Sequence, residues 1–383
     1  MSALCVGICV FKNESHGSLE KQRRSINVFN WGEFMSNGSD GLLNVNQEFE
    51  RLTGIHVNYT TFSSNEEMYA KIKSGSVLYD VVIPSDYMIA KMVSEGLLAK
   101  LNFDNIPNVK NIMPNLKGMV YDPQGEYSVP YAWGVVGVVY NSQQINKPVG
   151  GFDALWDEEL SGDILMFLNS RDAFSVALKK LGFSFNTDDK NEILLAAKEL
   201  RRQKKLVQAY VMDEIFDKMQ SAEALIAPYY SGDALVMMRD NQNLRFVFPK
   251  GTNRFIDAAC VLETSEKKEV AEQYINFLCE PRVALANALS GGYSTPNQQA
   301  FEMLPAEIRN SQIAYPSDDM LQTTECYCFK PAEIGELMDA LWIEIMVADE
   351  DNSIWVMPVF IVVCITTTIS IGIARMRGRK QRR

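Results

Sequence analysis

Aromatic, carboxylate, hydroxyl and amide side chains gather in six short segments, each where a predicted strand or helix begins or ends. These are the side chains that bind organic cations in proteins. The segments are 30–34 (Asn-Trp-Gly-Glu-Phe), 85–87 (Ser-Asp-Tyr), 169–172 (Asn-Ser-Arg-Asp), 229–233 (Tyr-Tyr-Ser-Gly-Asp), 255–257 (Phe-Ile-Asp) and 292–296 (Gly-Tyr-Ser-Thr-Pro).

An elongated organic polycation suits this combination of side chains. Its ammonium ends need carboxylates, which bind them through charge-assisted hydrogen bonds in a partly dry cleft. Its methylene groups prefer aromatic walls, where each cation–π contact is worth roughly 0.5–2 kcal/mol. Singly, each residue also has a structural explanation: Asp172 as an acid in a first helical turn, Ser85 as an N-cap, Tyr230 as a core ring. Their joint placement at strand ends favours binding.

The motifs of the large enzyme classes are missing from the chain. It contains no G-x-x-x-x-G-K-[ST], G-x-G-x-x-G or G-x-S-x-G sequence. Its two histidines are too few for a His-based zinc site, and Cys326 and Cys328 have no further metal-binding residues beside them in the sequence. We therefore expect a protein that is not an enzyme and uses no metal or cofactor. Clustered carboxylates acting as glycosidase acids are the alternative.

The charge of the chain is strongly uneven. It has 37 Lys and Arg against 48 Asp and Glu, a net charge of −11, yet basic residues crowd positions 375–383. The rest of the chain is more acidic still. A surface of that sign is a poor partner for nucleic acid, so we expect none.

Strands and helices alternate along most of the chain. Strands are predicted at 26–30, 57–62 and 80–83, each followed by a helix, and a second α/β block follows the β-rich run 128–141. This alternation indicates a mostly parallel sheet covered on both faces. In such sheets the ligand lies beyond the carboxyl ends of the strands, and segments 30–34, 85–87 and 229–233 follow predicted strands.

Four motifs resemble the polyamine-binding subunit, the spermidine/putrescine-binding protein, of bacterial ABC importers. They are 28–34 (Val-Phe-Asn-Trp-Gly-Glu-Phe), 79–87 (Tyr-Asp-Val-Val-Ile-Pro-Ser-Asp-Tyr), 129–134 (Val-Pro-Tyr-Ala-Trp-Gly) and 291–297 (Gly-Gly-Tyr-Ser-Thr-Pro-Asn). The resemblance covers residues 26–347. It implies an α/β, two-lobed periplasmic-binding-protein-like fold of type II, each lobe a mixed sheet flanked by helices.

The expected domains follow from this resemblance. Lobe 1 comprises residues 26–133 and 257–302, and lobe 2 comprises 134–256 and 303–348. Residues 1–25 form an N-terminal segment, interpreted as an incomplete export signal.

The resemblance also implies a set of ligand-binding residues. Trp31 forms a wall of the cleft, Ser85 and Tyr87 bind one amine end of the ligand, and Asp257 binds an ammonium group of the ligand. The full set is Trp31, Phe34, Ser85, Tyr87, Asn169, Asp172, Tyr230, Phe255, Asp257 and Tyr293. Glu33 belongs to the same motif as Trp31 and either contacts ligand or supports the fold. A further family contact near 327–330 does not align and stays unassigned.

Several of these positions depart from the family pattern. Phe34 stands where the family often has tyrosine, and Asp172 where it usually has glutamate. Asn169 replaces an aspartate of some members, while Tyr230 and Phe255 replace tryptophans. The ligand class is unaffected, but the choice between a diamine and a triamine stays open.

The implied function is capture of polyamines outside the cytoplasm. The lobes would close over spermidine or putrescine and deliver it to permease and ATPase subunits of an ABC importer. Two alternatives remain open. One is the same fold with another small solute, an amino acid, an iron complex or a sugar; an anionic or amino-acid ligand would want an arginine, and Arg171 is the candidate within the motifs. The other is a membrane-tethered sensor domain.

A membrane anchor is predicted near the end of the chain. Residues 354–374 carry no charged side chain, and a helix of that length reaches about 30 Å, the thickness of bilayer hydrocarbon. The basic tail 375–383 would stay cytoplasmic by the positive-inside rule. We therefore expect a single-pass protein of the cell membrane, with its binding domain on the extracytoplasmic face.

Overall fold

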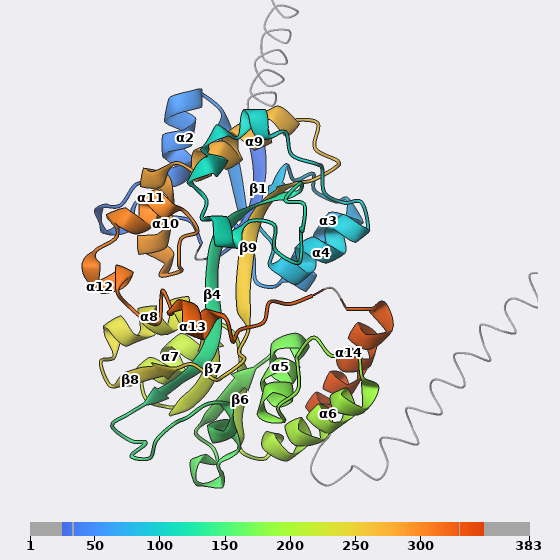
Figure 1. Cartoon of the computed structure of the whole chain (residues 1–383), viewed down its shortest axis with the longest axis vertical. Coiled ribbons are helices and arrows are strands. Elements are labelled where there is room, and N and C mark those ends of the chain that lie inside the picture. The colour runs from blue at the N-terminus through green and yellow to red at the C-terminus, as the bar shows by residue number, and fades with distance from the viewer. Residues whose placement is uncertain (1–24, 33, 329, 348–383) are drawn as a thin grey trace, which may run out of the picture.

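The computed structural model describes residues 25–32, 34–328 and 330–347 as an α/β protein (Figure 1). Its strands are β1 (Ser25–Trp31), β2 (His56–Phe62), β3 (Val81–Val82), β4 (Ser128–Asn141), β5 (Ile164–Phe167), β6 (Val207–Val211), β7 (Ile226–Tyr230), β8 (Leu244–Val247) and β9 (Arg254–Val261). Its α-helices are α2 (Val45–Thr53), α3 (Asn65–Ser74), α4 (Asp86–Ser94), α5 (Ser170–Lys180), α6 (Lys190–Lys204), α7 (Ile215–Gln220), α8 (Ser231–Asp240), α9 (Lys268–Leu278), α10 (Pro281–Gly291), α11 (Gln298–Met303), α12 (Ala306–Arg309), α13 (Asp318–Leu321) and α14 (Ala332–Val347). Short 3₁₀ helices are η1 (Ser39–Gly41), η2 (Phe103–Asn105), η3 (Pro107–Asn111), η4 (Pro114–Leu116), η5 (Phe152–Trp156) and η6 (Glu158–Leu160).

One continuous sheet runs through the molecule in the order β2-β1-β3-β9-β4-β7-β5-β6, and β8 also pairs with β4. The outer pairs β1–β2, β1–β3, β5–β6 and β5–β7 are parallel. The long strands β4 and β9 pair antiparallel with each other, and both run between the two halves in Figure 1. The sheet is therefore mixed, and the expectation of a mostly parallel sheet was wrong at its centre.

The first half of the molecule, built on β1 to β3 and most of β9, has helices on both faces of its sheet. Successive strand residues point to opposite faces, so Val28 and Val81 pack on one face while Phe29 and Val82 pack on the other. Helices α2, α9 and α10 cover the first face, and α3 and α4 cover the second. Continuous apolar runs such as 81–83 follow from this double burial.

The second half, built on β5 to β8 and the last part of β4, has a core of its own. Helices α5, α6 and α14 pack together there. Trp342 of α14 fixes that helix against the strands, because its Nε1 donates to the carbonyl of Leu168 at 3.0 Å. The end of the described chain is thereby held beside α5, which carries part of the site.

Most helices and strands predicted from the pattern are present. Strands β5 and β6 and helices α7, α8 and α11 to α14 were not predicted. β5 is a run of four apolar residues, and so short a run does not distinguish strand from helix by its period. β9 begins at Arg254, because its pairing with β4 extends through Phe255 and Asp257.

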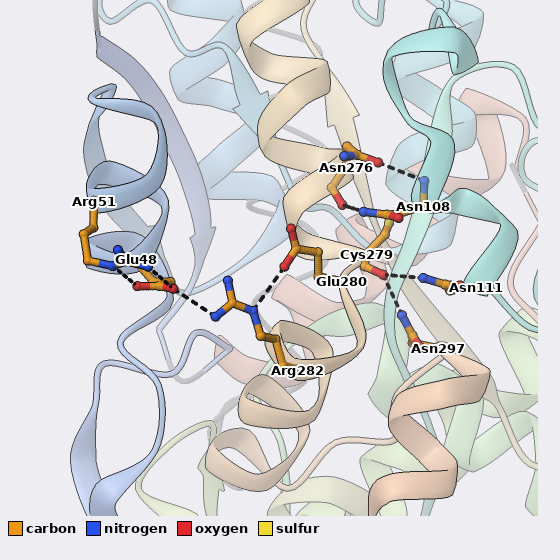
Figure 2. Close-up of polar contacts among 9 residues, drawn as sticks. All are labelled: Glu48, Arg51, Asn108, Asn111, Asn276, Cys279, Glu280, Arg282 and Asn297. Atoms are coloured by element: carbon orange, nitrogen blue, oxygen red, sulfur yellow. Dashed lines mark hydrogen bonds and ion pairs between the residues drawn. The ribbon is translucent and has the colours of Figure 1, made fainter.

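Asparagine amides close the C-terminal end of α9, as Figure 2 shows. A helix leaves its last carbonyls without partners inside the helix. The carbonyl of Cys279 accepts from Nδ2 of Asn111 at 3.1 Å and of Asn297 at 2.8 Å, and the carbonyl of Asn276 accepts from Nδ2 of Asn108 at 3.2 Å. Asn297 also ends the segment 291–297, so these bonds anchor the loop that carries Tyr293.

Helix α10, which leads into that loop, is tied to α2 by exposed ion pairs (Figure 2). Arg282 donates to Glu48 at 2.9 Å and to Glu280 at 3.2 Å, and Arg51 donates to Glu48 at 2.6 Å. The hydrogen bonds that Glu48 accepts from Arg51 and Arg282 lower its pKa to about 2. Exposed pairs contribute only about 0.2–1 kcal/mol each, so apolar burial of residues such as Val283 decides where α10 lies.

Some expectations concern residues outside the described ranges. They are the N-terminal segment except residue 25, Glu33, the predicted anchor 354–374 and the basic tail 375–383. Within the described ranges, no helix combines the length and the apolar character needed to cross a membrane.

Candidate ligand-binding site

Strand ends position most of the predicted site residues. Trp31 is the last residue of β1 and Tyr230 the last of β7. Ser85 precedes α4 shortly after β3, and Asn169 precedes α5 shortly after β5. The four strands place these residues at their carboxyl ends, the edge where α/β sheets bind ligands.

Asp257 reaches the same edge from the opposite direction. β9 is antiparallel to β3, so its first residues lie beside the carboxyl end of β3. Ser85 and Asp257 form an isolated bridge, and the Ser85 Oγ donates to Oδ1 of Asp257 at 2.6 Å. Phe255 lies two residues earlier on β9 and therefore on the same face of the sheet.

A continuous row of rings connects the two halves. Trp31 lies 6.1 Å from Phe34, and Phe34 lies 4.5 Å from Tyr293, measured between ring centroids. Tyr293 lies 6.1 Å from Phe255, which in turn lies 5.4 Å from Tyr230. A small pocket borders Phe34 and Tyr293. The row offers aromatic faces along the path of an extended ligand.

Two glycines allow these rings to approach the backbone closely. A Cβ atom at Gly134 of β4 would lie 2.7 Å from the ring of Phe255. A Cβ atom at Gly232 of α8 would lie 2.7 Å from the ring of Tyr293. Any larger residue at either position would displace a ring of the row.

Asp172 is the carboxylate of the second half, and donors surround it. Its Oδ2 accepts from the hydroxyl of Tyr230 at 2.5 Å and from Nδ2 of Asn169 at 3.0 Å. Its Oδ1 accepts from the hydroxyl of Tyr327 at 2.8 Å. Asn169 additionally caps α5 by accepting from the backbone N–H of Asp172. The side chain is only 8% exposed, so the site fixes this carboxylate firmly.

Tyr327 is a residue of this site that the sequence analysis missed. It lies in the segment that did not align, Cys-Tyr-Cys-Phe-Lys. Its ring makes edge contacts with Tyr87 at 5.9 Å and Phe185 at 4.8 Å. The available signal was the family contact expected near 327–330, which did not align with a residue of this chain and stayed unassigned.

Tyr87 reaches toward the second half from the start of α4. Its hydroxyl donates to Glu66 at 2.9 Å. The guanidinium carbon of Arg171, from α5, lies 3.7 Å from the centre of the Tyr87 ring. Arg171 was considered only as a possible partner for an anionic ligand; it contacts an aromatic ring of the site instead.

Burial shifts the pKa of the carboxylates in the first half. Desolvation raises the pKa of Asp257 to about 7, although the hydrogen bond from Ser85 opposes the rise. Desolvation also raises the pKa of Asp86 well above its ordinary value. The hydrogen bond from the Tyr87 N–H opposes this rise in pKa, and the negative charge of Asp257 adds to it. A nearby ammonium group would favour the ionised form of both.

The structure brings together every predicted site residue that it describes. These are Trp31, Phe34, Ser85, Tyr87, Asn169, Asp172, Tyr230, Phe255, Asp257 and Tyr293. Asp86 and Tyr327 join them without having been predicted. Across residues 25–32, 34–328 and 330–347, no three His, Cys, Asp or Glu side chains are arranged to hold a metal ion.

Comparison with known proteins identifies a family and several proteins that this chain resembles. Residues 76–324 match the family described as bacterial extracellular solute-binding protein. The spermidine/putrescine-binding periplasmic protein of Escherichia coli is 34% identical over 300 residues, which are 78% of this chain and 84% of that protein.

Two solved structures share the fold. One, from Listeria monocytogenes, is 34% identical with a TM-score of 0.80 and covers 85% of this chain and 99% of its own. The other, the spermidine/putrescine ABC transporter substrate-binding protein PotD from Streptococcus pneumoniae, is 33% identical with a TM-score of 0.74 and covers 84% and 98%. The fold is thus the periplasmic-binding-protein-like fold that the sequence predicted.

Proposed function

The chain belongs to the bacterial extracellular solute-binding proteins, among relatives named spermidine/putrescine-binding periplasmic proteins, and from this premise we propose that it captures a polyamine for an ABC importer. As a member of that family it is a solute-binding protein and not an enzyme, as the sequence analysis expected. The ligand, its contacts and the route of delivery are the substance of the proposal.

One observation carries the choice of ligand. Two buried carboxylates, Asp172 and Asp257, come from opposite halves, and a row of aromatic rings runs between the strands that carry them. A buried carboxylate is costly unless it meets a cation. A slender chain with an ammonium at each end offers a cation to both and lays its methylenes on the rings. A sugar or an anion would supply no opposite charge to either carboxylate.

Capture requires the two halves to part and close again. The rings of the site contact one another and Asp257 is only 2% exposed, so a ligand cannot reach that carboxylate in this arrangement. We propose that residues 26–133 and 257–302 form lobe 1, and that residues 134–256 and 303–348 form lobe 2. The separate cores of the two halves support this division. Hinge motion about β4 and β9 would open the site, and the closed form would dock on permease and ATPase subunits.

Calorimetric titration tests the ligand class. Putrescine is expected to bind, whereas 1,4-butanediol, which has the same carbon chain and no charge, is not. Glutamate and glucose serve as controls for the amino-acid and sugar alternatives. Binding of either control in the absence of polyamine binding would contradict the proposal.

Putrescine affinity is expected to rise about tenfold between about pH 6 and about pH 8. The pKa of Asp257 is about 7 in the ligand-free protein, so below that pH the carboxyl group is mostly neutral and must lose a proton to bind an ammonium group. Above it the carboxylate is already ionised, while the amines stay protonated. Calorimetry in buffers of different ionisation enthalpy measures the released proton directly. A constant affinity over this range, or one that falls with pH, would contradict the assignment of Asp257.

We also propose that residues 354–374 tether the protein to the membrane, with residues 375–383 on the cytoplasmic side. The uncharged run and the basic residues after it support this. Fractionation of cells that express the chain with and without residues 354–383 tests it. Release of the full chain into the soluble fraction would contradict the anchor.

A further inference from the structure

A basic surface lies at the C-terminal end of α6, far from the ligand site in sequence and in charge. Residues 198–205 (Lys-Glu-Leu-Arg-Arg-Gln-Lys-Lys) contain five basic side chains and one acidic side chain, in a chain whose net charge is −11. Arg202 and Lys205 are exposed. The acid, Glu199, already accepts from Lys180 at 2.9 Å, and Arg202 lies 3.6 Å from it. Residues 198–205, the α6 basic end, therefore carry an excess of positive charge.

The α6 basic end lies beside the end of α14. The two helices pack side by side in the second half (Figure 1). Arg201 pairs with Glu344 of α14 at 3.0 Å. Nζ of Lys204 donates to the carbonyls of Ile345 at 2.8 Å and Met346 at 3.0 Å, which belong to the last turn of α14 and have no partner within that helix. These two basic residues thus hold the end of α14, while Arg202 remains on the exposed face of α6.

The chain turns acidic directly after α14. Residues 349–351 are Asp-Glu-Asp, and α14 ends at Val347. Two residues of extended chain span at most about 7 Å, so this acidic run begins next to the end of α14. The C-terminal end of a helix repels acids through its dipole, and three acids there need cations nearby. The α6 basic end supplies cations at this place.

We propose that the α6 basic end is a docking surface for the acidic segment 349–351 of this chain. The docked segment attaches the start of the connection to residues 354–374 firmly to the second half. Since this consequence rests on the proposed membrane anchor, it adds a mechanical role: the second half keeps one orientation relative to the membrane, and the first half moves when the site opens and closes.

Cleavage after Glu350 by a glutamate-specific protease tests the docking. The substrate is the full chain in uncharged detergent micelles, and mass spectrometry measures the rate at this one bond. Arg202→Gln with Lys205→Gln should accelerate cleavage about fivefold, because two exposed charge pairs are lost. Lys110→Gln with Lys117→Gln removes the same charge from the surface of the first half and should leave the rate unchanged. Equal rates in the wild type and the first variant would overturn the inference.

An exchange of charges keeps the test independent of any general effect of substitution. Asp349→Lys with Asp351→Lys should also accelerate cleavage, and adding Arg202→Glu with Lys205→Glu to that chain should restore the slow rate. Each rate is divided by that of a synthetic peptide with the same residues 345–355, which corrects for the preference of the protease. Absence of this rescue would overturn the inference.

Anionic lipid is the other occupant that a basic surface of this kind attracts. The same cleavage is therefore measured in nanodiscs with and without phosphatidylglycerol. Slow cleavage that occurs only with phosphatidylglycerol would overturn the docking of 349–351 and indicate a lipid-binding surface. Putrescine titration separates this inference from the proposed function, because Arg202→Gln with Lys205→Gln should bind putrescine as the wild type does. If the wild type binds no polyamine, the proposed function fails, and the cleavage rates still decide the docking.

Discussion

Asp257→Asn is expected to weaken putrescine binding by roughly 100-fold or more and to leave the protein folded. Asp257 is 2% exposed, and the Ser85 hydroxyl is its hydrogen-bond donor. The ligand ammonium would supply the opposite charge, and removing one member of a buried charge pair costs about 2–5 kcal/mol. Calorimetric titration at about pH 8, where the wild-type carboxylate is ionised, measures this loss.

The stability of Asp257→Asn distinguishes a binding role from a structural one. The pKa of Asp257 is raised in the folded protein from 3.8 to about 7, so ionisation opposes folding as the pH rises through that range. Asparagine removes this opposition, and the ligand-free variant should melt at the same or a higher temperature than the wild type at about pH 8. A lower melting temperature would contradict this assignment and indicate a core residue.

Asp80→Asn is the matched control for that variant. Asp80 is also a buried acid, 5% exposed, but it lies at the amino end of β3, away from the site. It accepts from the backbone N–H of Asn27 at 2.8 Å and from the Ser265 hydroxyl at 2.6 Å. Asp80→Asn should lower stability and leave putrescine affinity unchanged. An equal loss of affinity in both variants would show that the Asp257 effect is indirect.

Asp172→Asn is expected to weaken putrescine binding by roughly 10-fold to 150-fold, the range for hydrogen bonds to charged groups. The variant removes the charge and keeps one of the two acceptor oxygens, so one of the hydroxyls of Tyr230 and Tyr327, which donate to different oxygens of Asp172, keeps its acceptor. Asp172→Ala removes the acceptors as well, so it should also destabilise the fold by about 1–3 kcal/mol for each buried donor left without a partner. Titration and thermal unfolding separate the two effects.

Tyr230→Phe provides the control for Asp172. It removes one donor from the carboxylate and keeps both the charge and the aromatic face. Its loss of affinity should be much smaller than that of Asp172→Asn. If the two losses are equal, hydrogen bonding by Tyr230 and not the charge of Asp172 determines affinity.

Local sequence patterns predicted the parts of this protein that depend on neighbouring residues. Val28 and Phe29 pack on opposite faces of the sheet as strand geometry requires, and Asn169 caps the start of α5 as its side chain favours. The rule that carboxyl ends of parallel strands meet at one edge accounts for Trp31 and Tyr230, whereas Asp257 and Tyr293 were predicted only through the family resemblance.

The features that were missed depend on distant contacts. Tyr327 reaches Asp172 across 155 positions of sequence, and only the fold brings them together. Asp86 is fully buried although it is a charged residue, which no local pattern predicts. Likewise, Arg171 is a surface residue by type, and its contact with Tyr87 exists only because α5 faces α4 where the halves meet.

A crystal structure of the protein with putrescine tests the central proposal most directly. We expect one amine nitrogen within hydrogen-bonding distance, about 3 Å, of Asp257 and the other at the same distance from Asp172. The carbon chain should lie against the row of rings from Trp31 to Tyr230. A diamine bound elsewhere, with Asp172 and Asp257 still contacting only protein groups, would contradict the account.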